Sequence, residues 1–130
     1  MKDEGVVPKS NLAVTTINHK DGSTSLVVKG KQPGGDTPVF NSATVKPGDN
    51  VKSVTVTPHG TDGKPNGASK TVTPSTPTTP TTVTFDAPTP AQYIIVVVHP
   101  TTPGKQATAE LVSIVACMPE AGRLIGIGCT

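Results

Sequence analysis

The longest apolar run in the chain extends from Tyr93 to Val98, and five of its six residues are β-branched. β-Branched side chains are stiff at χ1 and fit a pleated surface better than a helix. Because successive side chains on a strand point to opposite faces, a strand without polar alternation must be covered on both sides or lie in the middle of a sandwich. Pro90 and Pro100 flank the run, as expected for a residue that lacks the ladder N–H. We therefore predict that this run is the central strand of the fold.

Shorter runs of alternating apolar and polar residues surround it, separated by turns rich in Gly, Pro, Asn and Asp. The predicted strands are Val6 to Ile17, Ser25 to Lys29, Val39 to Val45 with a bulge at Asn41-Ser42, Val51 to Thr57, Thr71 to Thr73, Val83 to Phe85, Ala109 to Cys117 and a glycine-broken edge strand, Arg123 to Gly128. Asp21-Gly22 is a hairpin signal between the first two strands. No segment has helical periodicity. The pattern predicts an all-β, antiparallel β-sandwich of about eight short strands without significant helix.

The last long strand is predicted from simple alternation. One face would carry Leu111, Val115 and Cys117, and the other would carry Glu110, Val112, Ile114 and Ala116. We expect Glu110 to face solvent, because it is the one acid in the middle of a strand. The module would span residues 1–117, and residues 118–130 would form a tail or lead into a next module.

Two cysteines, Cys117 and Cys129, bear on this tail. An even count in a Pro- and Thr-rich chain fits an oxidising compartment. Paired with each other, they would tie the tail back to the last strand. The alternative is that Cys117 pairs with a cysteine outside this sequence.

The composition of the chain argues against two classes of function, nucleic-acid binding and membrane insertion. Hydrophobic residues make up 33% of the chain and aromatics 2%, so the core must be built from valine, isoleucine, leucine and threonine methyl groups. The net charge of +2 comes from scattered lysines, and with so few aromatics this argues against nucleic-acid binding. No apolar run approaches the roughly 20 residues of a membrane span, so we expect no membrane insertion.

Catalytic patterns are missing from the sequence. There is no G-x-S-x-G elbow, no glycine loop leading into a helix, and no pair of mid-strand acids. The three histidines, His19, His59 and His99, lie on separate predicted elements without metal-ligand spacing. We read them as surface residues and predict that the protein is not an enzyme.

One run of residues resembles a known family. The residues are Phe85, Ala91, Tyr93, Ile94, Val96, Pro100, Glu110, Leu111 and Cys117. Their order resembles the C-terminal third of discoidin-type domains, also called coagulation-factor C-type domains, and Val51 to Val56 followed by Asp62-Gly63-Lys64 is similar to an earlier strand and turn of that family. The resemblance implies a jelly-roll sandwich of the galactose-binding type. The family's tryptophans and opening cysteine are missing, and Ile95-Val96 replaces its usual arginine, so its ligand residues do not carry over.

Such sandwiches often hold a structural calcium ion, and the resemblance makes Asp36 and Asp49, both next to glycines, the first candidate ligands. The competing reading is that these aspartates only stabilise turns. The loop from His59 to Ala68 could make polar contacts with a sugar, with His59, Asp62 and Asn66 as candidate ligand-binding residues.

The Thr/Pro-rich stretch from Thr71 to Thr82 reads as an extended, polyproline-like connector. Such stretches are often O-glycosylated in secreted proteins, and Thr76, Thr78 and Thr79 are the candidate sites. The alternative is an unmodified, stiff linker.

Two functions follow. The first is a non-catalytic, secreted, extracellular module of a larger adhesive, matrix or mucin-like protein, with a structural or cohesive role and with other extracellular proteins or itself as partner. The second is a carbohydrate-binding module of the discoidin-like type that binds glycans, with calcium as the one candidate cofactor. The low aromatic content speaks against the second, because sugar sites usually stack a pyranose on an aromatic ring.

Overall fold

The computed structural model describes residues 6–31, 37–60, 62–120 and 123–126. A single short 3-10 helix, η1 (Lys9–Asn11), is the one helical element in these ranges. The strands are β1 (Val6–Val7), β2 (Leu12–Asn18), β3 (Thr24–Gly30), β4 (Val39–Pro47), β5 (Val51–His59), β6 (Lys70–Val72), β7 (Thr81–Pro90), β8 (Tyr93–Pro100), β9 (Ala109–Glu120) and β10 (Arg123–Gly126).

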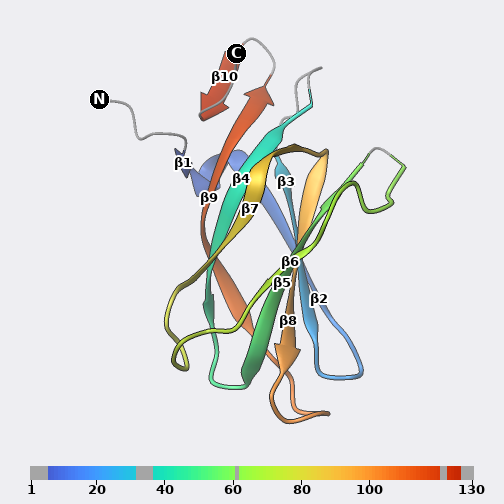
Figure 1. Ribbon diagram of the computed structural model, residues 1–130, viewed down its shortest axis with the longest axis vertical. Coiled ribbons are helices and arrows are strands. Elements are labelled where there is room, and N and C mark those ends of the chain that lie inside the picture. The colour runs from blue at the N-terminus through green and yellow to red at the C-terminus, as the bar shows by residue number, and fades with distance from the viewer. Residues whose placement is uncertain (1–5, 32–36, 61, 121–122, 127–130) are drawn as a thin grey trace.

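The strands form two antiparallel sheets that pack face to face (Figure 1). One sheet has the order β1-β9-β4-β7, with β10 also paired to β9, and the other has the order β2-β3-β8-β5-β6. When β2 and β10 are set aside, the first of the eight remaining strands pairs with the last, the second with the seventh, the third with the sixth and the fourth with the fifth. This is the strand order of a jelly roll. The predicted all-β sandwich is confirmed, and β2 and β10 are additions at its edges.

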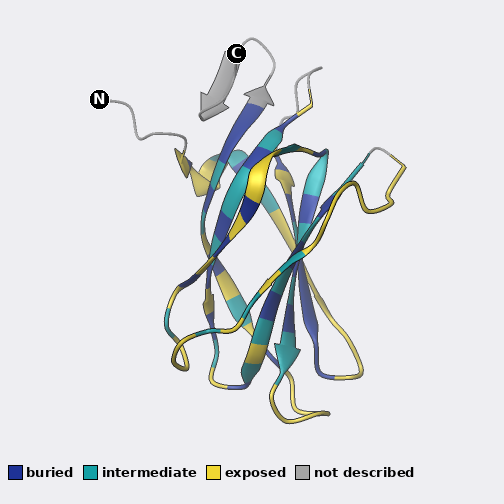
Figure 2. Cartoon of the chain, in the orientation of Figure 1, coloured by how far each residue is buried: buried dark blue, intermediate teal, exposed yellow. Residues whose placement is uncertain are grey.

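Strand β8 lies at the centre of its sheet, between β3 and β5, as predicted. Ile94, Val96 and Val98 point into the core and have no exposed surface. Ile95 and Val97 point to the outer face and are half-buried by neighbouring side chains, which explains why the strand can be apolar on both faces. Figure 2 shows the buried positions along the strands and the exposed positions mainly in the connections at the two ends.

The first predicted strand is wrong in one respect, because Val6 to Ile17 is not one strand. Pro8 cannot donate a ladder hydrogen bond, and the chain turns there through η1. Val6 and Val7 pair with β9 in one sheet, and the chain then crosses to the other sheet as β2.

The predicted faces of the last long strand are also wrong beyond Leu111. The register between β4 and β9 shifts between Thr44 and Val45, so that Val112 is an extra residue, a β-bulge. A bulge reverses the alternation that follows it. Leu111 and Ile114 are therefore both buried, whereas Val112 is 41% exposed. The bulge predicted at Asn41-Ser42 is confirmed by the register shift between Phe40 and Ser42.

The sandwich continues past the boundary predicted at residue 117. Strand β9 runs on to Glu120, and Met118 is 1% exposed within the core. Strand β10 pairs antiparallel with this end of β9, so the described part of the predicted edge strand, Arg123–Gly126, belongs to the same sheet.

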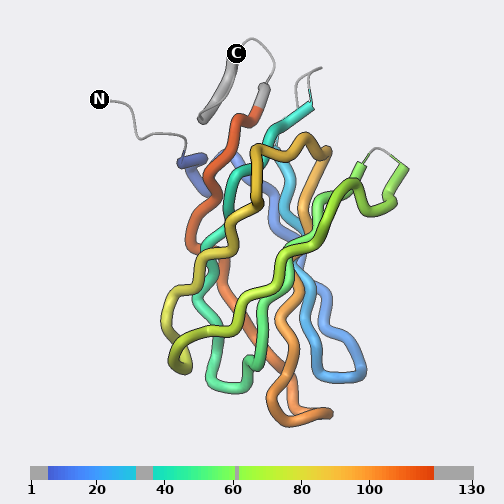
Figure 3. Tube along the Cα trace, viewed as in Figure 1, coloured from blue at the N-terminus to red at the C-terminus, as the bar shows by residue number. Residues whose placement is uncertain are grey.

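The Thr/Pro-rich stretch is a crossing between the sheets and not an extended connector. After β6 the chain makes a turn in which the Thr79 N–H donates to the Thr76 carbonyl at 3.3 Å. Thr78 within this turn has a φ of 63°. Thr81 and Thr82 already belong to β7, and Thr81 is buried. The tube in Figure 3 follows the chain through this crossing.

The end of the sandwich opposite η1 is closed by side-chain hydrogen bonds. The Asn50 amide donates to the Lys105 carbonyl at 2.8 Å, and its oxygen accepts from the Thr102 N–H at 3.0 Å. The Gln106 amide donates to the carbonyl oxygens of Gly22 and Ser23. These bonds tie the β4–β5 turn, the β2–β3 hairpin and the β8–β9 loop together.

A carboxylate in the β2–β3 hairpin gives a pH-dependent prediction. Asp21 Oδ1 accepts from the Ser23 hydroxyl at 2.7 Å and from the Ser23 N–H at 2.8 Å, and these bonds lower the pKa of Asp21 below its ordinary value of 3.8. Because the folded-state pKa is depressed, the stabilisation is present above the ordinary pKa and is lost as pH falls through the folded value. We expect Asp21→Ala to lower the thermal midpoint at neutral pH and to have progressively less effect below pH 3.8. An equal loss at all pH values would contradict this.

Candidate functional site at the loop end

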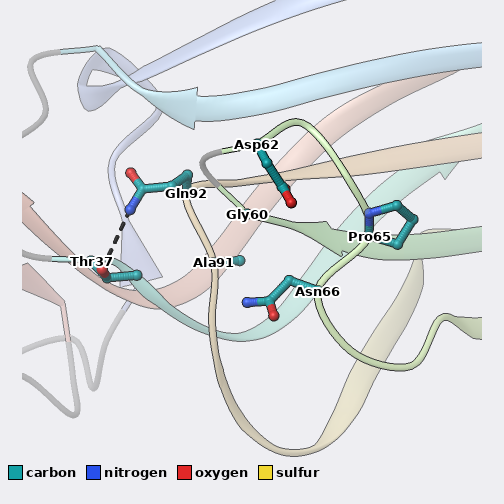
Figure 4. A pocket seen from close by; sticks show the side chains of 7 residues that line it. All are labelled: Thr37, Gly60, Asp62, Pro65, Asn66, Ala91 and Gln92. Carbon is teal, nitrogen blue, oxygen red and sulfur yellow. Dashed lines mark hydrogen bonds between the residues drawn. The ribbon is translucent and has the colours of Figure 1, made fainter.

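Three connections meet at the end of the sandwich that carries η1, namely β3–β4 and β7–β8, which run between the sheets, and β5–β6, which joins neighbouring strands of one sheet. They surround a pocket of about 360 Å³. Its lining residues are Thr37, Gly60, Asp62, Pro65, Asn66, Ala91 and Gln92. Figure 4 shows Asp62 and Asn66 on one side of this opening and Gln92 and Thr37 on another, with the Asp62 carboxylate pointing into it.

The β5–β6 connection is folded back on itself, which places Asp62 and Asn66 on the same pocket. The Asn66 N–H donates to the Pro58 carbonyl at 2.8 Å, and the Gly60 N–H donates to the Lys64 carbonyl at 3.0 Å. Asp62 Oδ1 accepts from the Lys64 N–H at 2.9 Å, the usual way in which aspartate stabilises a turn. Because one carboxylate oxygen is held by the backbone, the orientation of the Asp62 side chain is set before any ligand arrives.

The other walls are fixed by hydrogen bonds from the β7–β8 connection. The Gln92 N–H donates to the His59 carbonyl at 2.8 Å, and the Gln92 amide donates to the Thr37 hydroxyl at 3.3 Å. The Asn66 amide donates to the Pro90 carbonyl at 2.9 Å. These contacts link all three connections. The side chains of Asn66 and Gln92 use their amide nitrogens in these bonds. Their amide oxygens can therefore still accept hydrogen bonds from a ligand.

An aromatic pair lies next to the pocket, where β5 and β8 meet. His59 is the register partner of Tyr93, and their rings stack with centroids 5.1 Å apart and planes 7° from parallel. His59 Nδ1 is also 3.1 Å from the Gly63 carbonyl oxygen, so the ring is fixed to the same loop that carries Asp62. Both side chains are half-buried. They form a small, rigid, partly exposed ring surface beside polar groups.

Two of the three predicted ligand-binding residues, Asp62 and Asn66, line the pocket, and His59 lies beside it. Sequence reasoning missed Gln92 and Thr37. The Gln92 position offered a weak signal, because it is the one polar residue between Pro90 and the apolar run of β8.

The structure describes only one of the two calcium candidates. Asp49 is exposed in the β4–β5 turn at the opposite end of the sandwich, and Asp36 falls outside the described residues. Within the ranges that the structure describes, no three His, Cys, Asp or Glu side chains gather in a way that could hold a metal ion. The calcium site stays a prediction.

The remaining predicted sites lie elsewhere. Cys117 is 3% exposed, and Cys129 falls outside the described residues, so their pairing stays a prediction. Thr76 and Thr78 are exposed in the β6–β7 turn, whereas Thr79 is half-buried and its hydroxyl is hydrogen-bonded to that of Thr76. O-glycosylation there also stays a prediction.

Comparison of the chain with protein-family models and with curated proteins finds no match. The discoidin resemblance is therefore still a prediction. Of the described segments, none is a helix long and apolar enough to cross a membrane.

Proposed function

We propose that this chain is a non-catalytic, extracellular jelly-roll module that binds a carbohydrate at its loop-end pocket. The observation that carries the proposal is the convergence of Thr37, Asp62, Asn66 and Gln92, from three separate connections, on one pocket. The Thr- and Pro-rich composition and the even cysteine count favour the extracellular location.

The chemistry of these groups suits a sugar. A sugar hydroxyl both donates and accepts, and carboxylate and amide side chains offer acceptors and donors in fixed directions. Asp62 supplies a charged acceptor, which makes stronger hydrogen bonds than a neutral one. His59 and Tyr93 stack on each other beside the polar groups, and the part of the rings that stays exposed offers a sugar an apolar surface of limited size.

The first test is a glycan array probed with the folded protein, with and without calcium, followed by calorimetric titration of the best ligand. We expect Asp62→Asn to weaken binding about fivefold, because a hydrogen bond to a charged acceptor is worth about 1 kcal/mol more than one to a neutral acceptor. The substitution keeps an oxygen that can accept from the Lys64 N–H, so the loop should keep its conformation.

Asp49→Asn is the matched control, because it makes the same change at the opposite end of the sandwich and should leave the affinity unchanged. Binding that persists in Asp62→Asn would place the site elsewhere. An array without any specific hit, in both conditions, would overturn the carbohydrate proposal.

A structural or cohesive role is the second candidate. It is favoured by the distribution of exposed apolar side chains. The exposed large apolar residues among those described are Val6, Val14, Ile17 and Val112, and all lie on β1, β2 and β9. Val14 also lines a groove between β2 and β9, and an exposed apolar side chain beside a groove can contribute to a contact surface.

A further inference from the structure

The side of the sandwich formed by β1, β2 and β9 differs from the opposite side, where β6 and β7 lie close together. Between β2 and β9 a groove of about 480 Å³ remains open. Its lining residues are Lys9, Val14, Thr16, Leu26, Ala109, Glu110 and Leu111. Val14 faces this groove and is 43% exposed, and Ile17, on the outer face of the same strand, is also 43% exposed.

Strand β2 is the edge of its sheet, and it carries none of the features that usually protect an edge. Edge strands are normally kept from pairing with other chains by charges, proline, a bulge or very short length. The seven residues of β2 include no charge and no proline, and its register with β3 is continuous over the whole strand. Among the described residues, no strand pairs with its other edge.

The other edges of the two sheets are protected. Strand β7 carries Asp86, Pro88 and Pro90, and β6 is three residues long and includes Lys70. Strand β1 is two residues long, and the part of β9 beyond it holds the bulge at Val112. Strand β10, which pairs with the other end of β9, is four residues long and begins with the charged residue Arg123. The contrast marks β2 as the one described edge that is built to accept another strand.

We propose that β2 pairs antiparallel with β2 of a second copy of this chain, about a two-fold axis at Thr15, so that two five-stranded sheets become one continuous sheet. This inference rests on the second candidate function and names its partner. In this register Thr15 lies opposite Thr15 of the second copy, Val14 opposite Thr16, and Ala13 opposite Ile17. No like charges meet, and Val14 and Ile17 lose exposed surface on opposite faces of the joined sheet.

The charges around the groove favour a second copy over an unrelated partner. Lys9 precedes β2 at one end of the groove, and Glu110 lies near the start of β9 towards the other end. A two-fold axis across the middle of β2 reverses the direction of the groove. The Lys9 end of one copy therefore faces the Glu110 end of the second copy, and opposite charges meet on both sides of the axis.

The test is the self-association constant of the folded chain, measured by sedimentation equilibrium over a range of protein concentrations. We expect a monomer–dimer equilibrium in the wild type. Thr15→Lys and Thr15→Glu should each weaken dimerisation at least tenfold, because each sets like charges directly opposite one another. An equimolar mixture of the two variants should form the dimer again as a heterodimer, which a merely unstable variant could not do.

Thr84→Lys is the matched control, since Thr84 is an exposed strand threonine on β7 at the protected edge, and it should dimerise like the wild type. Thermal denaturation of each variant checks that the monomer is folded. A wild type that stays monomeric at all concentrations would overturn the pairing and self-association together. A dimer that tolerates Thr15→Lys would overturn the β2 pairing alone and leave self-association through another surface. Neither outcome bears on the glycan array.

Discussion

Val96→Asp is expected to unfold the protein. Val96 lies at the middle of β8, the central strand of its sheet, and has no exposed surface. A carboxylate at this position would lie between its buried cross-strand partners Leu26 and Val56, in an apolar core and without a partner for its charge. Burial of an unpaired charge is among the few changes that cost more than about 4–5 kcal/mol, which approaches the whole stability of a small domain. Circular dichroism and the thermal midpoint measure the effect.

The control is the next residue on the same strand. Val97 is half-buried on the outer face, so Val97→Asp keeps its carboxylate in contact with water and should cost much less. If both variants melt at the wild-type temperature, β8 is not the centre of the core. If both variants are equally unstable, then the low strand propensity of aspartate, and not burial of its charge, causes the loss of stability.

Asn50→Ala is expected to cause the second-largest loss of stability. The buried Asn50 amide donates to the Lys105 carbonyl and accepts from the Thr102 N–H. Alanine would leave both backbone groups without a side-chain partner. Both bonds are partly buried, and a hydrogen bond is worth about 0.5–1.5 kcal/mol, so a loss of about 1–3 kcal/mol is expected in urea denaturation.

Asn18→Ala is the comparison for this loss. Asn18 is an exposed asparagine at the end of β2, and its oxygen accepts one side-chain hydrogen bond, from the Thr24 hydroxyl at 3.2 Å. It should lose less than about 1 kcal/mol. Comparable losses in the two variants would show that the Asn50 bonds do not close that end of the sandwich.

The apolar pattern was sufficient to predict the sandwich and its central strand. The segment from Tyr93 to Val98 has too many β-branched residues for a helix and too few polar residues for an edge strand. Both properties can be read from the segment itself, without knowledge of its partners. The hairpin at Asp21-Gly22 and the bulge at Asn41-Ser42 also follow from short-range chemistry.

The errors arose where pairing with a distant strand decides the result. The bulge at Val112 depends on the register between β9 and β4, and the residues around Val112 carry no sequence signal for a bulge. The split at Pro8 depends on which sheet each half of the segment joins, although the proline itself was a signal. Dependence on distant contacts also limits how much of the pocket could be predicted from the sequence. Asp62 and Asn66 share a polar loop and were found, whereas Thr37 and Gln92 reach the pocket only because the sandwich brings three connections together.

The order in which the strands pair also determines how this chain folds. Thr24 on β3 pairs with Val98 on β8, and Val6 on β1 pairs with Val115 on β9. The strands near the N-terminus therefore cannot complete their pairing until the strands near the C-terminus are present. Sheets closed by such distant partners fold on the scale of about milliseconds to seconds, because the entropy of closing a long loop is lost before the contacts form. During synthesis, the β2–β3 hairpin emerges from the ribosome long before β8 can pair with β3 and before the other sheet can cover the apolar face of the hairpin. The nascent chain therefore passes through a period in which its least protected strand is exposed without a core behind it.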